Sequence, residues 1–319
     1  MTAAAPIHLA LGTNEKYVDF ALITLTSIAA FHSGTPIFLH LMHENLPEQA
    51  IGRFQALGAK CGIQVFPLNM PRELFQDFPH LPNGQIHPLV YRLALPVLLP
   101  EVKRMVYSDC DIIFLDDLEK LSSIALNGHA LGAVPDRAGQ RLPRGPEHDL
   151  PAEAIYFNDG LMVLDLDAMR AANSFDRCRQ LIRKHGRIPM VDQTLLNMLF
   201  WNDYERLPQR WNLINSVYRN LPLPGTYTLE ETKAAIQEPG AVHFTGHHKP
   251  WLFWKTTHHP YAERFWHFAI KAPIGPWSKF KFWLKAHSPH ACLKPPKKDV
   301  PWSSADLKKD WPAEQEIHF

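Results

Sequence analysis

The chain has 319 residues, enough for one large α/β domain or two smaller ones. Hydrophobic residues make up 46% and charged residues 20%, a balance that excludes disorder over most of the length. The formal net charge of +1 gives no field that would attract nucleic acid, so we expect no nucleic-acid partner.

The cysteines and the apolar runs bear on the cellular compartment. Cys61, Cys110, Cys178 and Cys292 are scattered and form no Cys-x-x-Cys pair, which indicates reduced thiols rather than a disulfide framework or a zinc knuckle. We see no basic segment typical of a secretory signal, and no run approaches the ~20 apolar residues that span a bilayer. We therefore expect a cytoplasmic enzyme.

Apolar runs alternate with amphipathic segments at the start of the chain. Strands are expected at residues 7–11, 36–42 and 63–68, with helices at 17–31 and 46–57 between them. This order predicts parallel strands with helices on the faces of the sheet. Farther along, strands are expected at 104–108, 112–115, 130–135, 161–166 and 241–244, and helices at 88–99 and 189–200.

The composition changes near residue 271, where Lys, Trp and Pro become mixed. We interpret residues 1–270 as a catalytic domain and residues 271–319 as a C-terminal tail. A helix over 277–285 would carry an apolar stripe, flanked by lysines, of Trp277, Phe280, Trp283 and Leu284. This pattern is typical of a helix lying in a membrane interface, and it also fits a helix that packs on the catalytic domain.

A pair of carboxylates is the sharpest feature of the sequence. Asp109 and Asp111 lie between two apolar, strand-like runs, so we expect them where a central strand ends. Two ionised carboxylates there would repel each other and lose solvation. A hard divalent cation such as Mg²⁺ or Mn²⁺ would remove both costs. The alternative is a solvated turn between two strands.

A second polar segment, HFTGHHKPW, begins at His243 and could complete this site. An imidazole with two carboxylates makes a plausible Mn²⁺ site. Gly246 would let the backbone approach a phosphate, and Lys249 would bring an ammonium to the same anion. For the other nearby histidines we expect ordinary core or surface roles: His247, His248, His258 and His259.

Four blocks of sequence together point to a known family. They are YRLALP with the downstream SDCDIIFL, then FNDGLMVLDLD, then VDQTLLN, and finally HFTGHHKPW. Their order and spacing resemble the family 8 retaining glycosyltransferases, which include bacterial lipopolysaccharide and lipooligosaccharide sugar transferases and the glycogenins. The resemblance covers about residues 7–265.

The resemblance implies an α/β protein with the GT-A nucleotide-diphospho-sugar transferase fold, an αβα sandwich with a mainly parallel central sheet. It also implies a UDP-sugar donor carrying glucose or galactose, Mn²⁺ as cofactor with Mg²⁺ as the alternative, and a saccharide acceptor. An acceptor of the lipopolysaccharide type would be lipid-linked. Peripheral contact with the inner face of the membrane, through the tail, would then be useful.

The resemblance also implies roles for single residues. The metal ligands would be Asp109, which also touches the donor ribose, Asp111 as the main ligand, and His243. Gly246 and Lys249 would contact the donor phosphates. The remaining donor-binding residues would be Asn14, Tyr17, Arg92, Cys110, Asp136, Asn158 and Asp159. Asp192 and Gln193 would lie beside the reacting centre as the catalytic pair.

Two positions depart from the family pattern. Asn14 stands where an acidic residue often contacts the uracil, and an amide offers both a donor and an acceptor there. Asp159 stands where a small residue is usual. An extra carboxylate at that position could alter the choice of donor sugar, or it could simply point to solvent.

Other interpretations of these residues stay open. Asp192 and Gln193 could stabilise a helix start, and Asn158 could be a turn residue before Gly160. Because a neutral amide such as Gln193 is a poor nucleophile, we favour attack on the same face that the leaving group departs from. A metal-dependent hydrolase of a sugar nucleotide or phosphate ester, and a non-catalytic nucleotide-sugar binding protein, are the alternative functions.

Overall fold

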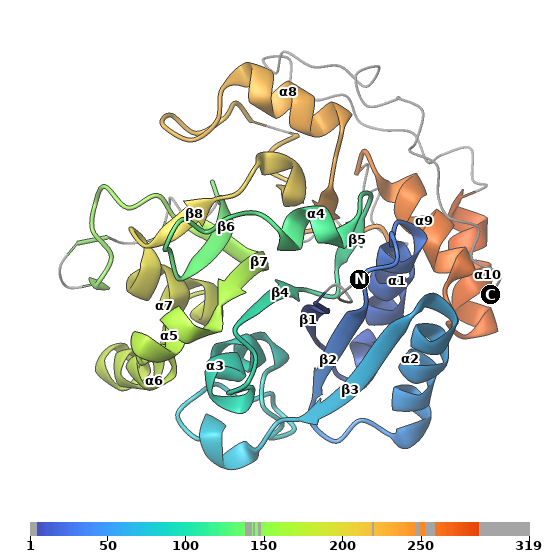
Figure 1. Cartoon of the computed structure of the whole chain (residues 1–319), viewed down its shortest axis with the longest axis horizontal. Helices are drawn as coiled ribbons and strands as arrows, with labels where there is room; N and C mark the ends of the chain where they lie inside the picture. Colours follow the sequence, from blue (N-terminus) through green and yellow to red (C-terminus); the bar gives the residue numbers. More distant parts are fainter. Residues whose placement is uncertain are drawn as a thin grey trace.

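The computed structural model describes residues 5–137, 142, 144–145, 148–218, 220–246, 249–252 and 259–286. A seven-stranded sheet in the order β3-β2-β1-β4-β7-β6-β8 runs through the middle of the molecule (Figure 1). Its strands are β1 (Ile7–Gly12), β2 (Ile37–His43), β3 (Ile63–Asn69), β4 (Arg104–Ser108), β6 (Leu131–Pro135), β7 (Phe157–Asp165) and β8 (Tyr204–Arg206). Only β7 runs against the others, since it pairs antiparallel with both β4 and β6.

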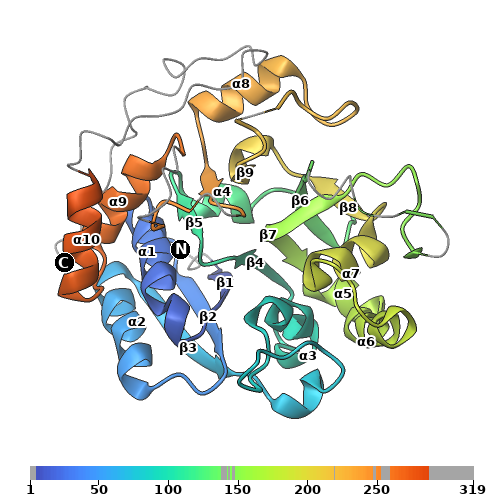
Figure 2. The same cartoon turned by 180° about the vertical axis from the view of Figure 1, so that it is seen from behind.

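Helices cover both faces of this sheet (Figures 1 and 2). One face packs against α1 (Val18–Ala30) and α2 (Glu48–Cys61), while α9 (Ala262–Lys271) packs on α1 and α10 (Pro276–Ala286) packs on α9. The other packs against η3 (Pro88–Ala94), α3 (Leu95–Leu98), α5 (Leu166–Ala171), α6 (Ser174–His185) and α7 (Val191–Phe200). The predicted αβα sandwich with a mainly parallel sheet is therefore confirmed.

Alternation along the strands explains the two cores. Val106 of β4 points into the core beside α1, whereas Met105 and Tyr107 point into the core beside α7. The same switch occurs along β7 between Val163 and its neighbours. Side chains of a strand alternate between faces, so a central strand with apolar residues on both faces must be buried between two layers.

A second, smaller sheet has the order β5-β10-β9, formed by β5 (Ile112–Phe114), β9 (Leu213–Ile214) and β10 (Ala241–His243). The strand predicted at 112–115 is thus present, but it leaves the main sheet directly after β4. In β5, Ile112 lies opposite His243 in antiparallel pairing. This pairing brings the start of β5 next to the end of β10.

Short helices complete the described fold. They are η1 (Glu15–Tyr17), η2 (Arg72–Phe75), α4 (Leu118–Ser122), η6 (Gln209–Trp211) and α8 (Leu229–Gln237). The helix predicted at 88–99 is divided into η3 and α3. Pro96 has no N–H to donate to the carbonyl of Arg92, which accepts instead from the N–H of Leu95.

Two differences from the predicted elements concern β7. The strand begins at Phe157, four residues before the predicted start, and Leu166 begins α5. Asn158 is therefore a strand residue, and the interpretation of Asn158 as a turn residue is wrong. Because β7 runs against β4, its first residues lie at the edge of the sheet where β4 ends, with Leu161 opposite Ser108.

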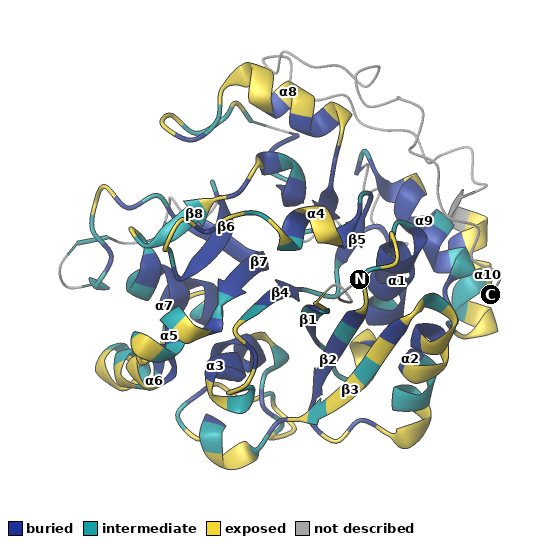
Figure 3. Cartoon of the chain, in the orientation of Figure 1, coloured by how far each residue is buried: buried dark blue, intermediate teal, exposed yellow. Residues whose placement is uncertain are grey.

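The end of the described chain packs on the catalytic core. Phe282 of α10 is buried, and its ring centroid lies 5.6 Å from that of Phe265. The stripe predicted from the sequence is exposed instead: Trp277, Phe280, Trp283 and Leu284. Figure 3 shows exposed stretches along α10. None of the helices in the described part of the chain has the length and apolar character that crossing a bilayer requires. Residues 287–319 of the predicted tail, Cys292 included, lie outside the described residues.

A glycine contact between α2 and β3 gives a test of this packing. A Cβ at Gly58 would lie 2.3 Å from the carbonyl oxygen of Ile63, so the helix would have to move away from the strand. We expect Gly58→Ala to destabilise the protein by about 2 kcal/mol, measured by chemical denaturation.

Gly52 in the same helix is the matched control, because a Cβ there meets nothing within 4 Å. Gly52→Ala should stabilise the protein by about 0.5–1 kcal/mol through the lower backbone entropy of alanine. Equal effects of the two substitutions would contradict the packing described here.

Candidate active site

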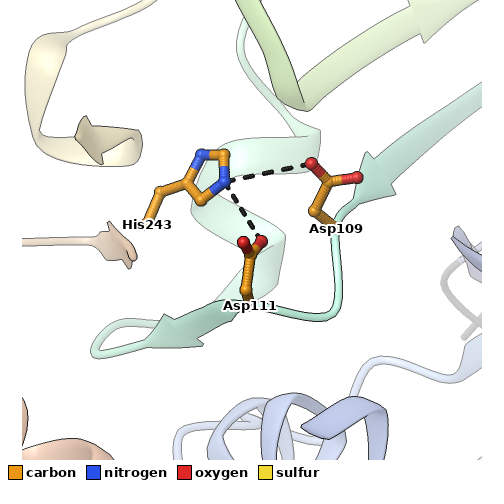
Figure 4. A group of neighbouring side chains, drawn as sticks. All are labelled: Asp109, Asp111 and His243. Atoms are coloured by element: carbon orange, nitrogen blue, oxygen red, sulfur yellow. Dashed lines mark ion pairs between the residues drawn. The ribbon is translucent and has the colours of Figure 1, made fainter. Parts of the chain in front are cut away.

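The two carboxylates and the histidine predicted as metal ligands meet at the junction of the two sheets (Figure 4). Asp109 follows β4, Asp111 precedes β5, and His243 ends β10. His243 Nε2 lies 3.1 Å from Asp111 Oδ1 and 3.9 Å from Asp109 Oδ2. We call these three residues the triad.

Backbone hydrogen bonds fix the segments that carry the triad. The N–H of Asp109 donates to the carbonyl of Gly160 at 2.7 Å, which ties the end of β4 to β7. The N–H of Phe244 donates to the carbonyl of Asp111 at 3.0 Å, which ties β10 to the start of β5. The spacing of the triad is therefore set by sheet pairing. The carboxylates do flank a turn between two strands, but their side chains are only 21% and 16% exposed.

Gly160 provides the space that the triad needs. A Cβ at this position would lie 2.2 Å from His243 Cε1 and 2.9 Å from Asp109 Oδ2. Contacts this short cannot exist, so any larger residue would push the imidazole or the carboxylate away. Glycine at position 160 is a requirement of the triad geometry.

The triad has the properties of a cation site. Asp111 Oδ1 is buried and lacks a hydrogen bond of good geometry. The other oxygen of the same carboxylate is bound by the ammonium of Lys249, which already acts as a cation there. Oxygen and imidazole ligands within 4.8 Å of one another fit Mn²⁺ or Mg²⁺.

Arg92 lies beside the triad and is almost completely buried, at 2% exposure. Its Nε donates to the carbonyl of Leu89. One terminal nitrogen contacts the carbonyl and carboxyl oxygens of Asp159, at 2.7 and 2.9 Å. The other contacts Asp109 at 2.7 Å and Asp192 at 3.2 Å. Five oxygen atoms of the protein thus surround the guanidinium.

Tyr107 contacts both the Arg92 guanidinium and the Asp109 carboxylate. The guanidinium lies 4.2 Å from the centre of the Tyr107 ring, and the Tyr107 hydroxyl donates to Asp109 Oδ1 at 2.7 Å. Asp159, the residue that departs from the family pattern, does not point to solvent. Its side chain is 6% exposed and faces Arg92.

The carboxyl groups of the site differ in acidity. Burial raises the pKa of Asp109, against the opposing effect of Arg92. Burial also raises the pKa of Asp159 well above its usual range, and the nearby Asp192 and Asp109 carboxylates add to this effect. Burial acts in the same direction on Asp111, but Lys249 and His243 outweigh it and hold the pKa of Asp111 below its usual range. Asp111 therefore stays ionised more readily than Asp109 or Asp159.

A network of buried amides lies next to Arg92. Asn158 Nδ2 donates to Asp136 Oδ2 and to Gln193 Oε1, both at 3.2 Å. Gln193 Nε2 donates to the same Asp136 oxygen at 3.0 Å. Asp192 is in the first turn of α7, where its carboxylate contacts Arg92. The structure therefore brings together four of the residues predicted at the donor sugar and the reacting centre.

The remaining predicted residues described by the structure include Asn14, Tyr17 and Gly246. Asn14 accepts a hydrogen bond from the N–H of Lys16 at 3.1 Å and so caps η1. Burial raises the pKa of Tyr17, and the Asp111 carboxylate adds to this effect while Lys249 opposes it. Gly246 has a φ of 65°, a left-handed conformation that favours glycine.

The thiols and the other histidines agree with the expectations where they are described. Cys110 is a free cysteine, as are Cys61 and Cys178. Burial raises the pKa of the Cys110 thiol well above its usual range, which keeps the thiol neutral. His259 is a core residue, packed 4.6 Å from the ring of Phe244. His247, His248 and His258 lie outside the described residues.

Sequence reasoning missed three residues of the site: Tyr107, Gly160 and Asn212. Tyr107 could have been found, because it lies two residues before Asp109 on a strand and so points to the same face. Gly160 belongs to the FNDGLMVLDLD block, but the block alone does not mark it as a residue of the site. Asn212 Oδ1 lies 3.1 Å from His243 Nδ1, and no local pattern marks Asn212 as a site residue.

Comparisons with known proteins agree with this geometry. The chain matches Glycosyl transferase family 8 over residues 8–255. It is 31% identical to General stress protein A of Bacillus subtilis (strain 168) over 225 residues, which cover 68% of this chain and 76% of that protein. It is 23% identical to the lipopolysaccharide 1,2-glucosyltransferase of Escherichia coli (strain K12) over 256 residues, which cover 78% and 73%.

Among solved structures, the galactosyltransferase LgtC in complex with donor and acceptor sugar analogs is similar, with a TM-score of 0.72 at 22% identity. The match covers 86% of this chain and 100% of that one. Fold and site together define a glycosyltransferase with the GT-A fold. The chain belongs to glycosyltransferase family 8.

The close approach of β7 to the triad gives a prediction. Gly160→Ala should displace His243 or Asp109, because the new Cβ would overlap both. We expect transferase activity to fall by more than ~100-fold, as for other ~1 Å displacements of reacting groups. Circular dichroism should show a folded protein, and wild-type activity of this variant would contradict the triad geometry.

Proposed function

We propose that the protein is a retaining, metal-dependent hexosyltransferase. It transfers glucose or galactose from a UDP-sugar to a saccharide acceptor, of the lipopolysaccharide type or another cell-surface glycan. Mn²⁺ is the cofactor, with Mg²⁺ as the alternative. The observation that carries the proposal is the triad, in which two carboxylates and an imidazole offer ligand atoms within 4.8 Å of one another. The similarity to a lipopolysaccharide glucosyltransferase and to a galactosyltransferase supports the class of donor and acceptor.

The balance of charge supports a metal requirement. Two permanent cations, Arg92 and Lys249, are shared by four acidic side chains: Asp109, Asp111, Asp159 and Asp192. Acidic groups in a buried site that outnumber its cations are costly to ionise, so the site favours an added cation. When bound at the triad, a divalent ion supplies Lewis-acid stabilisation of the diphosphate leaving group.

The loop after β10 serves the diphosphate in this proposal. Lys249 binds Asp111 through its ammonium, and this ammonium can turn to a phosphate once the triad carries another cation. The left-handed backbone at Gly246 presents no Cβ to an approaching phosphate. Asn14, Tyr17 and Cys110 then face the nucleoside part of the donor.

The amide network serves the sugar. Asp136 and Asn158 hold Gln193 in one orientation, and Arg92 holds the Asp192 carboxylate beside it. A neutral amide that is already hydrogen-bonded is a poor nucleophile. We therefore favour same-face attack, with Asp192 and Gln193 stabilising positive charge on the sugar. A trapped glycosyl adduct on Asp192 or Asp159 would overturn this mechanism.

Two other functions use the same residues. A metal-dependent hydrolase would release free sugar whether or not an acceptor saccharide is present, so product analysis with and without an acceptor separates it from transfer. A non-catalytic binder would be expected to lose a member of the triad, whereas all three are in place. Turnover of the donor with Mn²⁺ would exclude the non-catalytic binder.

Binding of UDP tests the metal site directly. The wild-type protein should bind UDP more tightly with Mn²⁺ than without it, because an ion held by Asp109, Asp111 and His243 would add positive charge beside the diphosphate. Asp111→Asn should weaken binding in Mn²⁺ by more than ~10-fold, since even residues that only support a ligand contribute ~10-fold or more. Isothermal titration calorimetry measures both quantities.

Asp77→Asn is the matched control, because Asp77 forms ion pairs with Arg179 and Arg183 away from the triad. This variant should bind UDP as the wild type does. If UDP affinity does not depend on Mn²⁺, or if Asp111→Asn retains it, the proposed metal site is wrong.

We further propose that α10 gives the enzyme a peripheral contact with the inner face of the membrane, where a lipid-linked acceptor would lie. The rings of Trp277, Phe280 and Trp283 stack in a row on the outside of the helix. The exposed fraction of Trp277 is 67%. Lys279 and Lys281 lie in the same helix, and each basic residue near an anionic surface contributes about 1 kcal/mol. Weak, reversible docking is the expected result.

Sedimentation with anionic liposomes tests this contact. Replacing Trp277, Phe280 and Trp283 by serine should reduce the bound fraction by more than ~10-fold, because most of the apolar contact is lost. Val97→Ser, at an exposed apolar residue elsewhere, should leave it unchanged. Equal binding by the two variants, or no binding by the wild type, would contradict the membrane contact.

A further inference from the structure

One fully buried amide connects the metal ligands with the sugar-facing network. Asn212, at 0% exposure, lies between η6 and β9. One atom of its amide is 3.1 Å from His243 Nδ1, and the other is 2.8 Å from Asn158 Oδ1. Asn212 thus contacts a member of the triad on one side and the amide network on the other.

A backbone N–H fixes the orientation of this amide. The N–H of Gly160 can only donate, and it points to Asn158 Oδ1 at 3.1 Å, so that atom must be the carbonyl oxygen. The Asn212 atom that faces the same oxygen must therefore be the NH₂ group. It follows that the Asn212 oxygen faces His243, and that His243 Nδ1 carries the hydrogen.

The consequence for the triad is a defined imidazole. With Nδ1 occupied as a donor to Asn212, only Nε2 can offer a lone pair, and Nε2 is the atom that faces Asp109 and Asp111. A hydrogen bond to the second ring nitrogen fixes both the tautomer and the ring orientation of a metal-binding histidine.

The consequence for the sugar side follows from the same amide. Asn158 Oδ1 is held by Asn212 and Gly160, so Asn158 Nδ2 must face Asp136 and Gln193. That contact in turn directs Gln193 Nε2 to Asp136. We propose that Asn212 is a positioning residue that sets both the metal-binding face of His243 and the orientation of the Gln193 amide. The inference rests on the proposed function, in which His243 binds the metal.

The two ends of the Asn212 amide can be separated by substitution. Asn212→Asp has nearly the same shape and keeps an oxygen for His243 Nδ1. It removes the donor to Asn158 and sets two oxygens against each other there. Asn212→Ala removes both contacts. If Asn212 were needed only for folding, the two substitutions would not differ in their effects on the metal side and the sugar side.

The test measures Mn²⁺ affinity and kinetics in the full-length protein. Electron paramagnetic resonance gives the Mn²⁺ dissociation constant with UDP present, and initial rates give kcat. Asn212→Ala should weaken Mn²⁺ binding ~10–100-fold, the usual effect of losing such support. Asn212→Asp should keep or tighten Mn²⁺ binding, yet lower kcat ~10-fold or more, because Gln193 is no longer held.

Asn197→Asp is the matched control for the added charge. Asn197 is equally buried, but it hydrogen-bonds to the backbone of Phe157 and to the Gln193 carbonyl rather than to His243. Asn197→Asp should not tighten Mn²⁺ binding. Thermal melting checks that each variant is folded, and Asn212→Asp compared with the wild type is sufficient if Asn212→Ala does not fold.

The inference is overturned if Asn212→Asp loses Mn²⁺ affinity as Asn212→Ala does, or if Asn212→Asp keeps the wild-type kcat. A wild-type protein that binds UDP without regard to Mn²⁺ would instead overturn the proposed function. The two failures are therefore distinguishable in one set of measurements.

Discussion

A single buried guanidinium organises the active site. Arg92 contacts carboxylates that follow β4, that lie in β7 and that begin α7, and it does so at 2% exposure. Removing a cation from such a cluster would leave several buried carboxylates without a partner, a change that typically costs 3–5 kcal/mol. The position of the divided helix η3–α3, which carries Arg92, is therefore coupled to the geometry of Asp109, Asp159 and Asp192.

The triad depends on a different kind of constraint, the pairing of strands far apart in the sequence. Asp111 and His243 come together because β5 leaves the main sheet and pairs with β10. The small sheet therefore positions a side chain rather than only enlarging the core. Its hydrogen bonds make the spacing between His243 and Asp111 a property of the fold.

Periodicity was enough to predict the first β-α-β-α-β unit, since its strands and helices are long and regular. It was also enough to place Asp109 at the end of a central strand. The division of the helix at Pro96 and the early start of β7 were not predicted, because both depend on local backbone chemistry within apolar runs. Asn212 could not be found, since its partners are Asn158 and His243, each more than thirty residues away. Contacts between residues so far apart in the sequence produce no local sequence pattern.

The reversed direction of β7 has a consequence for how the site meets its ligands. Asn158, Asp159 and Gly160 belong to a strand held on both sides, by β4 and by β6, so their backbone freedom is lost when the chain folds. Gly246 and Lys249 instead follow the end of β10, and neither is in a described strand that pairs with a neighbour. In the proposed function, the residues that face the sugar are therefore fixed by the fold before a donor binds, whereas Lys249 has to exchange its contact with Asp111 for one with phosphate, which lowers donor affinity. The proposal thus assigns discrimination among sugars and strength of nucleotide binding to separate parts of the chain.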